Sequence, residues 1–122
     1  MDRYEALYQF WASFGIPAFE ENSVPTGGDY PGYPYITYEA AVGGFDSDVI
    51  ANGYIWTRSP SWLEADTLAD TIEASLKNGG MLLPYTGGAI WITAEPNFAQ
   101  NMGDQSDNMI KRKILNVTYH YS

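Results

Sequence analysis

The side chains that could carry catalysis are sparse in this chain. It has one histidine, His120, and no cysteine, so thiol catalysis and thiolate zinc sites are excluded. A Ser-His-Asp triad would need His120, which lies in an alternating segment typical of a strand, where an exposed or hydrogen-bonded histidine is the simpler interpretation. The sequence also lacks a P-loop and a G-x-G-x-x-G fingerprint. We therefore expect no enzyme activity and assign no catalytic residue.

Metal and modification signals are equally weak. Asp104, Ser106 and Asp107 resemble a fragment of a calcium loop, but the later ligands and the bidentate glutamate of such a loop are missing. Asn116-Val117-Thr118 matches a glycosylation sequon inside a predicted strand. We expect no metal site and no cofactor.

The charge of the chain is strongly acidic and unevenly distributed. The formal net charge is −9, which argues against sequence-specific nucleic-acid binding because phosphate contacts need a basic footprint. All fifteen acidic residues precede the triplet Lys111-Arg112-Lys113, and the other basic residues are Arg3, Arg58 and Lys77. The split fits either a solvated surface or charge-matched assembly between protein copies.

Tyrosines gather around Pro31 and Pro34, and the four are Tyr30, Tyr33, Tyr35 and Tyr38. Exposed tyrosines suit protein interfaces because they provide large contact areas at low entropic cost. They also stack on sugars, or they simply cover a sheet. The sequence leaves these three interpretations open.

The first half of the chain predicts one helix and two strands. Residues 2–14 have Asp2 as a candidate N-cap, an apolar face, and Gly15 at the helix end. Residues 17–34 contain four prolines and predict an irregular arm. Alternation predicts strands at 35–40 and 49–57, with Gly53 marking a bulge or a close approach of two backbones.

The second half predicts another helix and two more strands. Ser61 and Glu64 form a capping box ahead of the stripe Ala65, Leu68, Ala69, Ile72 and Leu76. A short strand at 89–93 precedes a polar loop at 95–108, and a last strand spans 109–121 with a break in its alternation near Lys113. No apolar run approaches the length of a membrane span.

The order of elements predicts a single α+β domain over residues 1–122. We expect an antiparallel four-stranded sheet with two helices packed on one side, in the order α-β-β-α-β-β.

Several segments together resemble a known family. They are PAFEENSVP (17–25), YPYITYEA (33–40), RSPSWLEADTLADTI (58–72), GGAIWI (87–92) and EPNFAQNMGDQSDNMIKRKILNVTYHY (95–121). Their order and spacing resemble the tail terminator, or tail completion, proteins of long-tailed bacteriophages and prophages. None of these segments is catalytic, so it is the order and spacing that carry the resemblance.

The resemblance implies a structural role in virion assembly. Tail terminators form a hexameric ring that caps the finished tail tube and then joins the head. The implied partners are other copies of the chain, the major tail tube protein and a head-completion or neck protein, with no membrane. The implied location is the bacterial host cytoplasm during assembly and then the tail or neck of the virion. A head-closure or minor capsid protein is the alternative from the same phage region, and a small carbohydrate-binding module is the alternative from another class.

The segment from the polar loop to the triplet supplies the candidate assembly interface. We expect the loop to be mobile in the free protein and to order on docking. The candidate residues are Phe98, Met102, Asp104, Asp107, Lys111, Arg112 and Lys113.

Overall fold

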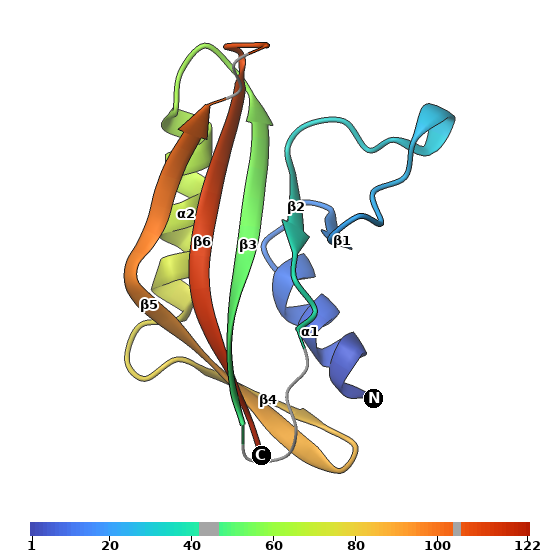
Figure 1. Ribbon diagram of the computed structural model, residues 1–122, viewed down its shortest axis with the longest axis vertical. Coiled ribbons are helices and arrows are strands. Elements are labelled where there is room, and N and C mark those ends of the chain that lie inside the picture. The colour runs from blue at the N-terminus through green and yellow to red at the C-terminus, as the bar shows by residue number, and fades with distance from the viewer. Residues whose placement is uncertain (42–46, 104–105) are drawn as a thin grey trace.

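The chain folds as a single sheet with helices on one side (Figure 1). The computed structural model describes residues 1–41, 47–103 and 106–122. The elements in chain order are α1 (Arg3–Ala12), β1 (Ala18–Glu20), the 3₁₀ turn η1 (Gly27–Asp29), β2 (Tyr35–Tyr38), β3 (Asp48–Arg58), α2 (Leu63–Ser75), β4 (Met81–Tyr85), β5 (Gly88–Gly103) and β6 (Ile110–Tyr121).

The sheet is larger than the sequence predicts. Within the described residues it has six strands in the order β1-β2-β3-β6-β5-β4, and β1 runs parallel to β2 while the other neighbours are antiparallel. The α+β class agrees, but the antiparallel four-stranded sheet is wrong. β1 is only three residues long inside the proline-rich arm, too short for alternation to show. β4 contains Pro84, which a strand tolerates because β4 lies at the edge of the sheet.

Strand β5 also corrects the expected polar loop. It continues through residues 95–103 instead of ending near Thr93, and both of its halves pair with β6. The register shifts between Ala94 and Ala99, where Asn97 adopts φ 56° and its carbonyl oxygen accepts a hydrogen bond from Asn116 Nδ2 at 2.9 Å. β6 pairs with β3 without a shift, so the irregularity lies in β5 and not near Lys113.

Helix α1 begins as its sequence predicts. The Asp2 carboxylate accepts a hydrogen bond from the Glu5 N–H at 2.8 Å, and Gly15 adopts φ 85° after the helix. The helix itself ends at Ala12, two residues before the expected end. Phe10 and Trp11 are buried, and the Trp11 indole packs so closely on β3 that a Cβ on Gly53 would lie 2.4 Å from it. Gly53 therefore marks the close approach of a side chain, and not a bulge or a second backbone, since β3 has no shift in register.

Helix α2 keeps its predicted buried stripe but not its predicted cap. The helix starts at Leu63 with Trp62 in the N-cap position, and the Ser61 hydroxyl accepts a hydrogen bond from the Leu63 N–H at 3.2 Å. The fully buried members of the stripe are Ala65, Ala69, Ile72 and Leu76, while Leu68 is half-buried.

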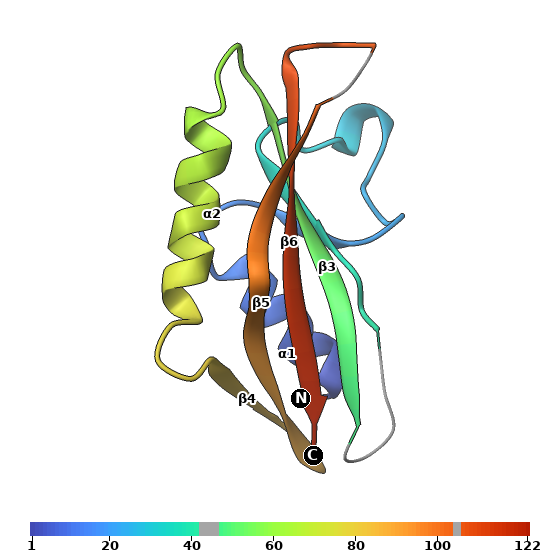
Figure 2. The same ribbon diagram turned by 60° about the vertical axis from the view of Figure 1, so that its left-hand side comes forward.

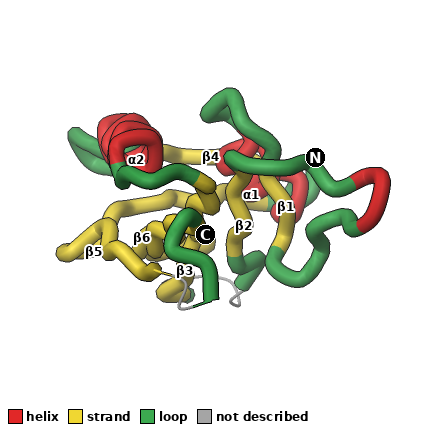
Figure 3. Tube along the Cα trace, turned by 90° about the horizontal axis from the view of Figure 1, so that it is seen from above, coloured by secondary structure: helices red, strands yellow, loops and turns green. Residues whose placement is uncertain are grey.

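Both helices lie on the same side of β3, β6 and β5 (Figures 2 and 3). They cover a core that includes Leu7, Ile55, Ile72, Ile92 and Leu115. The other side of these strands carries no helix among the described residues. Among those helices, none has the length and apolar character needed to cross a lipid bilayer.

Candidate functional site: the open face of the sheet

The side of the sheet that carries no helix is called the open face here. Strand alternation places side chains of even number on this face of β3 and β6, because Leu115, Val117 and Tyr119 point into the core. The same register puts Tyr35 and Thr37 of β2 on the open face, beside Trp56 and Tyr54. The open face is therefore rich in aromatic and polar side chains.

One row of side chains crosses the open face from strand to strand. Tyr35, Trp56, Arg112 and Met102 are directly opposed in the register of β2, β3, β6 and β5. The Tyr35 and Trp56 ring centroids lie 6.0 Å apart with an interplanar angle of 13°. The Arg112 guanidinium carbon lies 5.0 Å from the Trp56 ring centroid, and its Nη2 contacts Met102 Sδ. This transverse row holds a cation between an aromatic ring and a thioether.

A groove of about 350 Å³ lies along this row. Its floor is made by Tyr35, Thr37, Tyr54, Trp56 and Arg112, and its rim by Glu21, Asn22 and Val24 of the arm. The Trp56 indole N–H donates to the Thr37 hydroxyl at 2.9 Å, which fixes the ring orientation. Burial raises the pKa of Tyr54, the Glu21 and Glu39 carboxylates raise it further, and Arg112 opposes them.

The arm places two further tyrosines beside Tyr35. The Tyr30 and Tyr33 ring centroids lie 5.9 Å and 5.6 Å from that of Tyr35. Burial and a hydrogen bond with Tyr30 raise the pKa of Tyr33 to about 12. Tyr38 instead faces the core and stacks on Trp11 at 6.0 Å. The tyrosine cluster of the sequence thus divides between the groove and the core.

The basic triplet Lys111-Arg112-Lys113 is divided between the two sides of the sheet. Lys113 forms an ion pair with Asp66 of α2, and the Lys111 ammonium lies 5.8 Å from the Trp62 ring centroid, so both lysines lie on the helix side. Arg112 points to the open face and has no carboxylate partner among the described residues. The triplet is not one continuous basic surface.

The remaining predicted interface residues lie in different surroundings. Phe98 is buried in the core, whereas Met102 is 38% exposed beside Arg112. Asp107 forms an ion pair with Arg58 at 3.0 Å and accepts a hydrogen bond from the Met109 N–H at 2.9 Å. Asp104 lies outside the described residues.

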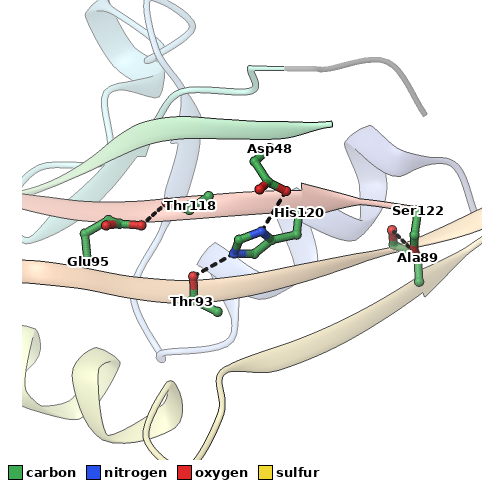
Figure 4. Close-up of polar contacts among 7 residues, drawn as sticks. All are labelled: Asp48, Ala89, Thr93, Glu95, Thr118, His120 and Ser122. Carbon is green, nitrogen blue, oxygen red and sulfur yellow. Dashed lines mark hydrogen bonds and ion pairs between the residues drawn. The ribbon is translucent and has the colours of Figure 1, made fainter. Parts of the chain in front are cut away.

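His120 lies at the opposite end of the open face, between two hydrogen-bonding partners (Figure 4). Its Nδ1 lies 2.8 Å from Asp48 Oδ1, and its Nε2 lies 2.9 Å from the Thr93 hydroxyl. The order of carboxylate, imidazole and hydroxyl matches a hydrolytic triad. Thr93, however, pairs with Thr118 in the β5–β6 ladder, where the described backbone groups beside it face the strand partner and provide no oxyanion hole. We interpret the set as a lock that ties β3, β6 and β5 together.

The two aromatic groove residues of β3 are the ones that the sequence reasoning missed. The alternation of β3 could have placed Tyr54 and Trp56 on one face, but their position opposite Arg112 depends on a register that the sequence does not reveal. Within the described residues, no three His, Asp or Glu side chains gather closely enough to hold a metal ion.

Comparison with protein-family models and with curated proteins found no match for this chain. The geometry of the open face and the resemblance in the sequence are therefore the two grounds for a functional proposal.

Proposed function

We propose that this protein is a structural assembly subunit of a phage tail. It acts as tail terminators do, by forming a ring of copies that caps the completed tail tube and joins it to the head. The observation that supports this proposal is the open face of the sheet, which presents the transverse row and its groove instead of a second helical layer.

The exposed residues of this face have the composition of an interface. Four large apolar side chains are exposed on it: Ile50, Leu82, Trp91 and Met102. Aromatic residues, methionine and arginine are enriched where proteins associate. An acidic chain that leaves such a face uncovered is suited to bind another protein surface.

The overall charge supports a ring around a DNA channel. Six copies at −9 each would bring a formal charge of about −54 into one ring. DNA must pass through a tail lumen without binding to it, and acidic side chains repel phosphate within about 8 Å at physiological salt. We expect carboxylates to be enriched on the wall of the channel.

Carbohydrate binding is the competing function from another class, and the aromatic groove is the reason to consider it. Sugars stack on exposed ring faces, but Trp56 is flanked by Tyr35 on one side and by Arg112 on the other. The covered ring favours a protein partner over a sugar.

Electron microscopy of tail tubes tests the proposal. Tubes assembled from the cognate major tail tube protein should acquire a ring of this protein at one end and stop elongating. Bovine serum albumin at the same concentration serves as the control. Tubes whose ends stay bare, or that keep growing at the same rate, would contradict the proposed function.

A further inference from the structure

We propose that the groove around Arg112 receives the outer surface of helix α2 from a second copy of this chain, with Asp70 of that copy paired to Arg112. This inference rests on the proposed function in one respect, because both require the chain to associate with itself. It goes further by naming the two surfaces that meet.

Arg112 is a cation of the open face that has no acidic partner among the described residues. Arg58, Lys113 and His120 each lie beside a carboxylate, namely Asp107, Asp66 and Asp48. Arg112 instead lies 5.0 Å from the Trp56 ring centroid and 5.8 Å from that of Tyr54, and it is half-buried. Aromatic rings already hold this guanidinium in place, so binding would cost it little further conformational entropy. A carboxylate that reaches it therefore forms a strong charge-assisted pair.

The groove can bind side chains of a partner but cannot add a strand to the sheet. It lies over β2, β3 and β6, which are interior strands whose backbone groups are already paired with neighbours. Its volume of about 350 Å³ accommodates a few side chains. A helix that presents small side chains, one apolar side chain and one carboxylate matches this shape and chemistry.

The outer surface of α2 has these properties. Leu63, Thr67, Asp70 and Ala74 follow one another at helical spacing on the side opposite the buried Ala65, Ala69 and Ile72, and all four are exposed. We call these four residues the outer ridge. Leu63 is 73% exposed, and the Asp70 side chain has no partner among the described residues. The ridge therefore offers a free apolar side chain and a free carboxylate, separated by small residues that allow close approach.

The groove and α2 lie back to back across the same short segment of β6. Lys111 and Lys113 reach from this segment toward Trp62 and Asp66 near the start of α2, while Arg112 points the opposite way. A copy displaced perpendicular to the sheet would therefore bring its α2 near the groove of its neighbour. The two surfaces differ, so the contact is head-to-tail and repeats from copy to copy. Such a contact forms a ring when the rotation between copies closes and an open filament when it does not.

Cross-linking tests the contact directly, because the chain has no cysteine of its own. Met102→Cys places a thiol beside Arg112, and Thr67→Cys places one on the outer ridge. With a short bismaleimide, a mixture of the two single variants should give a covalent dimer, and the double variant should give a ladder of dimers, trimers and larger species. The control pairs Met102→Cys with Tyr8→Cys, since Tyr8 is 50% exposed on α1. Equal yields from the control pair and the test pair, or no cross-linking by either, would overturn the proposal.

A charge exchange distinguishes Asp70 from other carboxylates. Arg112→Asp alone and Asp70→Arg alone should each lower the yield of the cross-link at least tenfold, and the double exchange should restore it. Glu5→Arg on the exposed side of α1 makes the same charge change as Asp70→Arg and should leave the yield unchanged. Failure of the double exchange to restore the yield would overturn the Asp70–Arg112 pair.

The two proposals fail in different ways. If wild-type protein caps tail tubes but the cross-link is absent, the groove does not hold a second copy. Loss of capping by Arg112→Asp would then show that the groove binds another tail protein. If the cross-link forms but tubes stay uncapped, the contact stands and the proposed tail function fails.

Discussion

At the scale of single residues, the core is organised by Tyr119 and the side chains that it joins. The Trp11 indole N–H donates to the Tyr119 hydroxyl at 3.0 Å, and that hydroxyl donates to the Glu39 carbonyl at 2.9 Å. Trp11 and Tyr119 are fully buried. The chain of hydrogen bonds attaches α1 to β6 and to the end of β2, so a buried polar group serves to fix the position of a helix.

Tyr119→Phe should remove this link without changing the shape of the core. The indole N–H and the Glu39 carbonyl would each lose a partner, which costs about 2 kcal/mol in the free energy of unfolding. Tyr8→Phe at an exposed position should cost almost nothing. Urea unfolding of both variants checks the difference, and equal midpoints would contradict it.

Gly53→Ala should destabilise the protein by steric conflict. The added Cβ would lie 2.4 Å from the Trp11 ring, which is enclosed on all sides by the core. Overpacking of this kind costs about 1–3 kcal/mol. Gly28→Ala, where the Cβ meets nothing within 4 Å, is the matched control. A melting temperature that falls equally for both would exclude the close approach as the cause.

Buried tyrosines should make the protein sensitive to alkali. Burial raises the pKa of Tyr38 and of Tyr121 from 10.0 to about 12. The folded state therefore keeps protons that the unfolded state loses, so their contribution is complete below about pH 10 and is lost as the pH rises toward 12. The melting temperature should fall between these values, and less steeply in the double variant Tyr38→Phe/Tyr121→Phe. Equal slopes for wild type and variant would contradict this assignment.

At the scale of elements, β5 shows how an irregular strand places two apolar residues differently. The extra residues between Ala94 and Ala99 bring Phe98 into the core, while Met102 stays on the open face. Both residues looked like interface anchors in the sequence, because the surrounding residues are polar.

Phe98→Ala should therefore lower stability, and Met102→Ala should not. Removal of a buried phenyl ring costs about 3–5 kcal/mol, whereas exposed positions change stability by about 0.5 kcal/mol or less. Urea unfolding measures both variants, and sedimentation then measures Met102→Ala for association. Similar losses of stability in the two variants would contradict the placement of Phe98.

The elements also show what a sequence of this kind reveals. Helical spacing predicted α1 and α2, and alternation predicted β3, because each of them has one buried face. Alternation also predicted β2 and β6, although all four residues of β2 are buried. Pro84 concealed β4, and Pro96, Asn97 and Gly103 gave the second half of β5 the composition of a loop. Pairing with neighbouring strands outweighs the local preference of these residues for turns and loops. The pairing partners cannot be predicted from local sequence. The groove was hidden for the same reason, since it depends on the register between β3 and β6.

At the scale of the whole molecule, one side of the sheet holds the core and the other is available for binding. The helix side holds the core and pairs Lys113 with Asp66, while the open face keeps Arg112 and several exposed apolar side chains uncovered. If Arg112 and Asp70 meet between copies, association should weaken as salt rises, because the pair forms near a surface. Sedimentation at about 0.05 M and 0.5 M sodium chloride checks this, and association that is unchanged by salt would contradict an ionic contact.

The number of copies bound at each tail tube end tests the central claim most directly. Native mass measurement of the complex released from capped tubes should give six copies of the 13.6 kDa chain, which is about 82 kDa. The Arg112→Asp variant should leave the tube ends without a stable ring. Binding of single copies along the whole tube, or no binding to tubes at all, would contradict the assignment of this protein as a ring-forming subunit of the tail.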